Sequence, residues 1–175
     1  MKQIQTNVVF DILEKNKQKI VALQGSSRSG KTYNTLIWII FSYCNKHTNR
    51  VISICRKTLP SLKASVLRDF LEILKNNDLY SEIYHNKTSN EYWLNGNLIE
   101  FFSLDMGSRV RGRKRDLLFV NEANEVDLES WNQLLFRTDG AEGEVSVIID
   151  YNPHDQFHWI YDKVLERPDC QLHIS

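Results

Sequence analysis

The chain has 175 residues, 42% of them hydrophobic and 25% charged, and its 22 Lys and Arg residues balance its 22 Asp and Glu residues. We expect one domain covering residues 1–175, with enough apolar side chains for a packed core. The balanced charge excludes a polycation, so any contact with nucleic acid must depend on a local basic patch. The sequence shows neither a secretory signal core nor an apolar stretch long enough to cross a membrane. Its three cysteines, Cys44, Cys55 and Cys170, form no C-x-x-C pair, which indicates a reducing cytoplasm and no disulfide framework.

The first third of the chain predicts a helix, then a strand, a loop and a second helix. Residues 6–17 have the spacing of a short amphipathic helix, and the apolar run at 19–24 predicts a strand. A longer helix is expected over 30–46. The loop between this strand and helix, residues 25–32, reads G-S-S-R-S-G-K-T. It matches the phosphate-binding pattern G-x-x-x-x-G-K-[ST] in the strand–loop–helix setting that the pattern requires.

This loop predicts a binding site for a nucleoside triphosphate. Its glycines let several backbone N–H groups face one point, where the N-terminus of the following helix adds its positive end. Lys31 would then reach the β- and γ-phosphates, and the hydroxyl of Thr32 would ligate Mg²⁺. Arg28 reaches bound phosphate, switches between phosphate and a carboxylate, or is an exposed cation. The alternative for the whole loop is a Gly/Ser turn before a helix that begins with Lys. The residues expected to bind the nucleotide are Gly25, Ser26, Ser27, Arg28, Ser29, Gly30, Lys31 and Thr32.

Beyond residue 50 the chain alternates between apolar strands and helices. The pattern predicts strands at 51–55, 117–120 and 145–149, and helices over 61–75 and 127–138. Residues 82–104 differ, because two apolar runs flank Asn95-Gly96, a strong hairpin signal. Parallel strands that alternate with helices and are interrupted by one hairpin predict a three-layer α/β fold. We expect a mainly parallel central sheet with an antiparallel hairpin insertion.

In such a sheet ligands bind at the carboxyl ends of the strands, so the residues after each strand are candidates for chemistry. Glu122 follows the strand at 117–120 and suits a general base, or a group that positions the attacking water in γ-phosphoryl transfer. The alternative is an acid that complements a helix dipole, a role that suits Glu125, Asp127 and Glu129 better. Asn121 offers an oxygen without a charge, so it would hold Mg²⁺ through water and less strongly than Asp would. We expect the substitution Asn121→Asp to be tolerated.

Other polar residues also follow strands or form a basic cluster. Asn152 follows the last predicted strand and either senses the γ-phosphate or starts a turn, because Asn-Pro favours turns. Arg56 follows the second strand and contacts nucleotide or DNA, or is a solvated cation at a helix start. Residues 109–115 hold five basic side chains in seven, among them Arg111 and Arg113. Such a cluster contacts DNA phosphates, inserts an arginine into a neighbouring subunit's site, or is only a solvated face.

Together these segments resemble the ATPase domain of the large terminase subunit of tailed bacteriophages, the motor that packages double-stranded DNA. The resemblance covers roughly residues 8–165 and depends on an ordered set of motifs. In chain order they are Gln24–Thr32 with its internal arginine, Ser53–Thr58, the Asn95-Gly96 hairpin, Val110-Arg111-Gly112, Val120-Asn121-Glu122-Ala123-Asn124-Glu125 and Asn152-Pro153. The phosphate loop alone is shared by many NTPases, whereas the ordered set is much more specific.

The resemblance implies an ASCE-type P-loop NTPase fold with ATP and Mg²⁺ as its ligands. It implies that Lys31 and Thr32 bind phosphate and Mg²⁺ and that Glu122 is catalytic. Arg28 is expected to act within the loop, and Asn152 to couple hydrolysis to movement.

The resemblance also implies that an arginine from one subunit completes the site of the next. The candidates for this arginine, or for a DNA contact, are Arg56, Arg111 and Arg113. The implied partners are double-stranded DNA, a portal protein and a small terminase subunit, in a ring of identical subunits in the host cell cytoplasm and without a membrane.

The chain ends about one strand past the motor motifs, and no carboxylate cluster suited to two-metal cleavage follows them. We therefore expect a motor domain without the family's C-terminal nuclease domain. The alternatives are a helicase-like or other nucleic-acid-dependent P-loop NTPase, and a nucleotide-gated DNA-binding module that hydrolyses little. For the adenine base, Gln24 or a polar group near Gln5 to Asn7 is a candidate.

Overall fold

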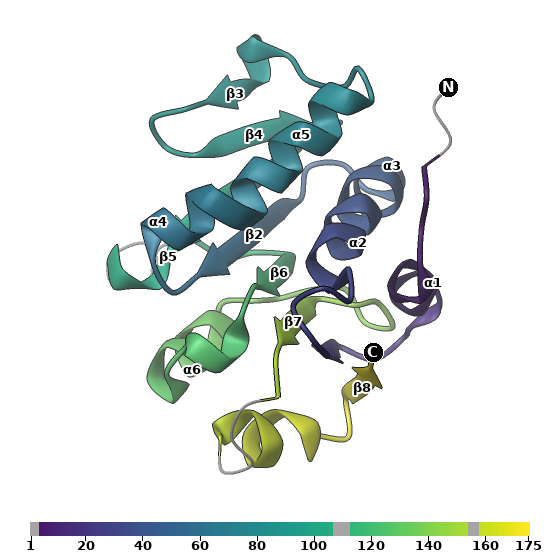
Figure 1. Ribbon diagram of the computed structural model, residues 1–175, viewed down its shortest axis with the longest axis vertical. Coiled ribbons are helices and arrows are strands. Elements are labelled where there is room, and N and C mark those ends of the chain that lie inside the picture. The colour runs from purple at the N-terminus through teal and green to yellow at the C-terminus, as the bar shows by residue number, and fades with distance from the viewer. Residues whose placement is uncertain (1–3, 107–112, 154–157) are drawn as a thin grey trace.

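Helices and strands alternate along residues 4–106, 113–153 and 158–175, which the computed structural model describes (Figure 1). The strands are β1 (Ile20–Gln24), β2 (Val51–Arg56), β3 (His85–Asn86), β4 (Glu91–Leu94), β5 (Asn97–Ser103), β6 (Leu117–Val120), β7 (Val147–Tyr151) and β8 (Cys170–Ile174). The α-helices are α1 (Val8–Lys15), α2 (Lys31–Trp38), α3 (Cys44–Lys46), α4 (Leu59–Leu62), α5 (Arg68–Asn76) and α6 (Leu128–Phe136). Short 3₁₀ turns lie at Glu82–Tyr84, Leu104–Met106 and Ala123–Glu125, and π-helical turns at Ile39–Tyr43, Lys63–Leu67 and Tyr161–Leu165.

Two of the π-helical turns lie inside helices that the sequence predicts as regular. One joins α2 to α3 and the other joins α4 to α5, so each predicted helix is continuous. The second of these helices begins at Leu59 because the side chain of Thr58 caps it by accepting a hydrogen bond from the backbone N–H of Ser61.

One eight-stranded sheet runs through the molecule in the order β3-β4-β5-β2-β6-β7-β1-β8. The strands from β5 to β8 in this order pair in parallel, whereas β3, β4 and β5 pair antiparallel. Figure 1 shows β3 and β4 at one end of the sheet and β8 at the other. The mainly parallel sheet with an antiparallel hairpin insertion is therefore confirmed.

The two faces of the central strands belong to separate hydrophobic cores. Val21 and Leu23 of β1 pack with α1, α2 and α5, whereas Ile20 and Ala22 pack with α6. This division follows because successive residues of a strand point to opposite faces. Helices cover both faces, which confirms the three-layer α/β fold and explains why the central strands are apolar throughout. None of the helices in the described ranges has both the length and the apolar character needed to cross a membrane.

The turn between β4 and β5 follows its sequence signal. Asn95 has φ of 50° and Gly96 has φ of 77°, the pair of positive values that a type I′ turn requires. A Cβ atom on Gly96 would lie 2.5 Å from Oγ1 of Thr48, and this hydroxyl donates a hydrogen bond to the carbonyl oxygen of Asn95 at 3.1 Å. Both the backbone conformation and the close approach of Thr48 therefore favour glycine.

Strand β7 begins and ends two residues later than predicted, which changes the position of Asp150. Asp150 lies within the strand and is 1% exposed, although the sequence predicts it in the turn that follows. Aspartate is unfavourable in strands, so the pattern alone ends the strand before it. The folded chain keeps Asp150 in the strand because its backbone pairs in register with Leu23 of β1, while hydrogen-bond donors from distant segments reach its carboxylate.

We predict that Gly96→Ala lowers the free energy of unfolding by about 2 kcal/mol. The variant forces alanine into a left-handed backbone conformation and brings its Cβ atom too close to Oγ1 of Thr48. Gly143→Ala is the matched control, since Gly143 has the same φ of 77° and no atom within 4 Å of its Cβ position. The control should cost about 1 kcal/mol. Urea unfolding of both variants measures the difference, and equal losses would show that the Thr48 contact carries no cost.

Candidate functional site

The phosphate-binding loop lies beside the carboxyl ends of two neighbouring strands. β1 leads into the loop and pairs in parallel with β7, which in turn pairs in parallel with β6. The end of β7 and the residues after β6 therefore lie next to the start of α2. Hydrogen bonds from the side chain of Thr32 to Asp150 and from Asn121 to Thr32 join the three segments.

The loop curls around the ammonium group of Lys31. Nζ of Lys31 donates hydrogen bonds to the carbonyl oxygens of Gly25 (2.8 Å) and Ser26 (2.7 Å) and to Oγ of Ser29 (3.1 Å). Gly30 precedes α2 with φ of 76°, a left-handed conformation that favours glycine. A cation is thus held beside the N-terminus of a helix, and both features favour phosphate oxygens at this position.

Exposure and charge differ along the loop. Residues 26–28 are exposed, so the side chain of Arg28 is free to face solvent, whereas Lys31 is 6% exposed. Burial lowers the pKa of Lys31, and the nearby charges of Asp150 and Glu122 oppose this effect. The role of Arg28 stays a prediction.

Asp150 is a buried carboxylate that connects the loop with the end of β6. Its Oδ2 accepts a hydrogen bond from Oγ1 of Thr32 at 2.6 Å, and its Oδ1 accepts one from the backbone N–H of Glu122 at 2.7 Å. Nδ2 of Asn121 lies 3.0 Å from each carboxylate oxygen. Burial raises the pKa of Asp150, and these hydrogen bonds together with the charge of Lys31 oppose the rise.

Asp150 is not among the site residues predicted from the sequence. The signal that identifies Glu122, an acid at the carboxyl end of an apolar strand, is present at Asp150 as well. It is weaker there because the sequence pattern ends the strand early, so Asp150 belongs to a predicted turn.

Asn121 points its amide nitrogen at Thr32 and Asp150. Nδ2 lies 3.2 Å from Oγ1 of Thr32 and 3.0 Å from the Asp150 oxygens, and the side chain is 2% exposed. The reverse orientation would set the amide oxygen against a carboxylate, which only accepts hydrogen bonds when ionised. The expectation that Asn121→Asp is tolerated is therefore revised, because a second carboxylate would stand within hydrogen-bond distance of Asp150 and the like charges would repel.

Glu122 has an uncommon backbone conformation. Its φ of 52° and ψ of 54° lie in the left-handed region, which non-glycine residues rarely adopt and which is enriched at functional sites. Its Oε2 accepts a hydrogen bond from Nδ2 of Asn152 at 3.5 Å, so the structure brings these two predicted residues together. Burial raises the pKa of Glu122, the charge of Asp150 raises it further, and Arg56 opposes the rise.

Arg56 turns towards its own chain. One guanidinium nitrogen donates a hydrogen bond to Oγ of Ser65 at 2.8 Å, and Nε lies 3.7 Å from a carboxylate oxygen of Glu125. The side chain is 18% exposed and close enough to Glu122 to lower its pKa. This placement suits a role inside the site better than a contact with DNA or with another subunit.

The structure divides the basic run at residues 109–115. Arg111 lies outside the described residues. Arg113 is half exposed, and its guanidinium lies 3.9 Å from a carboxylate oxygen of Glu100. Arg115 is 1% exposed and belongs to the interior. Arg113 is therefore the arginine of this run that the described structure leaves accessible.

Oxygen ligands suited to a magnesium ion are present beside the loop. The hydroxyl of Thr32 and the carboxylate of Asp150 are hard donors, and Mg²⁺ at nucleotide sites uses one or two such groups together with phosphate oxygens. In the part of the chain that the structure describes, no group of three or more His, Cys, Asp or Glu side chains is arranged to hold a metal. The residues present therefore fit a magnesium ion that takes its remaining ligands from the phosphate oxygens of a nucleotide.

A surface pocket of about 530 Å³ adjoins the loop at the start of α2. Asn7 joins the pocket to the loop, because its side chain donates a hydrogen bond to the carbonyl oxygen of Ser29 at 3.4 Å and its backbone N–H donates one to Asn34 at 2.9 Å. Gln24 instead accepts a hydrogen bond from the hydroxyl of Tyr151 at 3.0 Å. Of the two candidate positions for the adenine base of the nucleotide, the region of Gln5 to Asn7 is the one that borders this pocket. The lining residues are Ile4, Gln5, Thr6, Asn7, Tyr33, Asn34, Ile37, Asn76 and Asn77.

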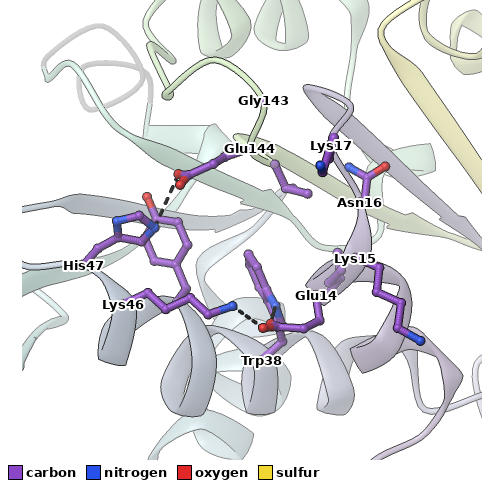
Figure 2. A pocket seen from close by; sticks show the side chains of 12 residues that line it. Glu14, Lys15, Asn16, Lys17, Trp38, Lys46, His47, Gly143 and Glu144 are labelled. Atoms are coloured by element: carbon purple, nitrogen blue, oxygen red, sulfur yellow. Dashed lines mark hydrogen bonds and ion pairs between the residues drawn. The ribbon is translucent and has the colours of Figure 1, made fainter.

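A second pocket lies at the opposite edge of the sheet. Its lining includes Lys17 and Glu144, which precede the amino ends of β1 and β7. Figure 2 shows the contact of Glu144 with His47 and the ion pair of Lys46 with Glu14 around the pocket. Its volume of about 180 Å³ is below the range typical of small-molecule sites. The phosphate loop follows the carboxyl end of β1, so it lies at the other edge of the sheet from this pocket.

A phosphate loop after β1, an acid after β6 and a mainly parallel sheet between two helical layers define a P-loop NTPase. A family model described as phage terminase large subunit matches residues 17–173, and the chain belongs to this family. A search of curated protein sequences gave no match.

Solved structures of phage terminases have the same fold. The large terminase of a thermophilic bacteriophage superposes with a TM-score of 0.76 at 16% identity, over 95% of this chain and 43% of that protein. The HK97 bacteriophage large terminase gives 0.69 at 14% identity, over 90% of this chain and 35% of that one. The large terminase ATPase domain of Thermus phage P74-26 gives 0.68 at 14% identity, over 97% and 80%. The chain thus spans less than half of the first of these proteins, which has also been solved in complex with ADP and with ATP-γ-S.

We predict that Glu122→Gln raises the free energy of unfolding at neutral pH by about 0.5–1 kcal/mol. Burial raises the pKa of Glu122, so its ionised form is less favourable in the folded state than in the unfolded state. The gain should therefore shrink as the pH falls below the folded pKa and native Glu122 becomes protonated. Thermal unfolding across this pH range tests it, with exposed Glu142→Gln as the control, and a destabilised variant at neutral pH would contradict it.

Proposed function

We propose that this chain is the ATP-hydrolysing motor domain of a DNA-packaging terminase, which couples hydrolysis to the translocation of double-stranded DNA into a procapsid. The observation that carries the proposal is the pairing of a phosphate loop with Glu122. This acid lies just after β6, has a left-handed backbone conformation and contacts Asn152. Membership of the phage terminase large subunit family supports the same reading. Residues 1–175 would form one ATPase domain, as the match to the P74-26 ATPase domain suggests.

Phosphate binding would use the loop and Lys31. The three oxygen atoms that Lys31 contacts belong to the loop itself, so the ammonium group can exchange some of them for phosphate oxygens without a large movement. Magnesium, when bound, would neutralise charge on the β- and γ-phosphates, with Thr32 among its ligands. The pocket beside Gln5 to Asn7 would receive the adenine base.

Hydrolysis would use Glu122 as the base that orients and deprotonates the attacking water. A carboxylate with a raised pKa is a better proton acceptor than an ordinary surface glutamate. Asn152 would respond to the state of the γ-phosphate through the carboxylate of Glu122, a role that its hydrogen bond to Oε2 of Glu122 supports.

The whole motor would act with double-stranded DNA, a portal protein and a small terminase subunit, as a ring in the host cell cytoplasm. Arg113 is exposed enough to reach a neighbouring subunit or a DNA phosphate, and Arg111 remains a second candidate. Steep dependence of the ATPase rate on protein concentration would support an arginine supplied by a neighbour.

We predict that Glu122→Gln lowers ATP turnover by about 10²- to 10⁴-fold and leaves ATP affinity within a few-fold of the native value, because it removes the base and keeps the loop. Turnover and binding are measured with and without double-stranded DNA, and Glu142→Gln is the control that should match the native chain. Equal turnover in the native chain and Glu122→Gln would refute the assignment. Strand separation independent of a portal would favour a helicase-like enzyme instead.

We predict that Arg56→Gln moves the acidic limb of the ATPase pH profile to higher pH. Glu122 must be deprotonated to act, so activity rises with pH through its pKa, and Arg56 holds that pKa down. Turnover on the alkaline side should stay near the native value. Arg68→Gln, on exposed α5 surface, is the control, and a limb that stays in place or moves to lower pH would contradict the coupling.

A further inference from the structure

Asp150 is buried in the sheet, and the hydrogen-bond donors that reach it are neutral. They are the hydroxyl of Thr32, the amide of Asn121 and the backbone N–H of Glu122. Burying a carboxylate among neutral donors is unfavourable compared with an apolar or amide side chain of similar size. Stability alone therefore does not explain an acid at this position.

The strand register places Asp150 and Asn121 side by side. Val120 of β6 pairs with Ile149 of β7. The residues that follow them, Asn121 and Asp150, therefore lie at the same level of the carboxyl edge. Both side chains reach one atom, Oγ1 of Thr32, at 2.6 Å from Asp150 and 3.2 Å from Asn121. Since the side chain of Asn121 is an uncharged amide, Asn121 and Asp150 together present one negative charge to Thr32. Asp150 of β7 supplies that charge.

We propose that Asp150 is the carboxylate of the magnesium site in this chain and that Asn121 positions it, so that β7 carries the acid that β6 lacks. The inference rests on the proposed function, because it assigns the charge that an ATP-binding site needs beside Thr32.

The direction of the hydrogen bonds is consistent with this role. Oγ1 of Thr32 donates its proton to Asp150 and accepts one hydrogen bond from Asn121, which leaves one lone pair of the hydroxyl for a cation. Oδ1 of Asn121 is buried and has no hydrogen-bond partner among the described residues. A water bound to a metal is a donor that such an acceptor can use. Asp150 also holds the backbone of Glu122, so the metal side of the site and the base are fixed to one another.

The test exchanges the two side chains and measures how magnesium changes nucleotide affinity. ATP-γ-S binding is measured by calorimetry in Mg²⁺ and in EDTA for the native chain, Asp150→Asn, Asn121→Asp and the double variant Asn121→Asp/Asp150→Asn. We expect Asp150→Asn to reduce the enhancement by magnesium about 10- to 100-fold, with little change in EDTA. The double variant returns one acid and one amide to the site and should recover most of the enhancement. Asp139→Asn, which removes an exposed acid, should match the native chain.

The outcomes separate a metal ligand from a structural residue. A structural role would lower the melting temperature of Asp150→Asn and leave the enhancement in the folded protein unchanged, which would overturn the proposal. If Asp150→Asn does not fold, the double variant decides: a folded double variant without magnesium enhancement overturns the proposal, and one with the enhancement supports it.

ATP turnover of the native chain is measured in parallel. A native chain that shows the magnesium enhancement and its loss in Asp150→Asn, yet does not hydrolyse ATP, contradicts the proposed function and supports the assignment of Asp150. A native chain without any magnesium enhancement overturns the assignment.

Discussion

The hydrogen bonds that converge on the carboxylate of Asp150 join three segments that are far apart in the sequence. They reach it from Thr32 at the start of α2, from Asn121 after β6 and from the backbone of Glu122. Only a parallel arrangement of β1, β7 and β6 brings these segments to one edge, because parallel strands present their carboxyl ends on the same side. The sheet order thus places the phosphate loop, Asp150 and Glu122 at one edge, and that order depends on apolar strands buried on both faces.

The site itself is unfavourable for stability. It contains Glu122 in a left-handed backbone conformation and the buried acid Asp150, whose hydrogen-bond donors among the described residues are neutral. The amide oxygen of Asn121 has no hydrogen-bond partner among the described residues. Two hydrophobic cores, one on each face of the sheet, offset these costs. Among the described residues with positive φ, Glu122 is the one that is neither glycine, asparagine nor aspartate, the residue types that tolerate this conformation best.

Much of the fold follows from local sequence signals. The phosphate loop has four fixed residue types in a strand–loop–helix setting, and Asn95-Gly96 marks its hairpin through two positive φ values. The π-helical turns could not be predicted, because a shift of one residue in the backbone hydrogen bonds leaves no apolar pattern. Arg115 lies in a run of basic residues, the pattern of a solvated face, yet its guanidinium is buried against the hydroxyl of Ser53 at 3.0 Å. Asp150 could not be assigned to the site because its neighbours are defined by sheet register, which is a property of the fold.

The register between β6 and β7 has a consequence for how such enzymes are recognised. A signature written along one strand asks for an acid pair in consecutive positions, and Asn121-Glu122 fails that pattern. Across the sheet, two acids do stand side by side, because the backbone N–H of Glu122 after β6 donates a hydrogen bond to Oδ1 of Asp150 in β7. Under the proposed assignment of Asp150, the residues at one level of the carboxyl edge define the site better than consecutive residues of one strand, because an acid on β7 would take the role of an acid at position 121.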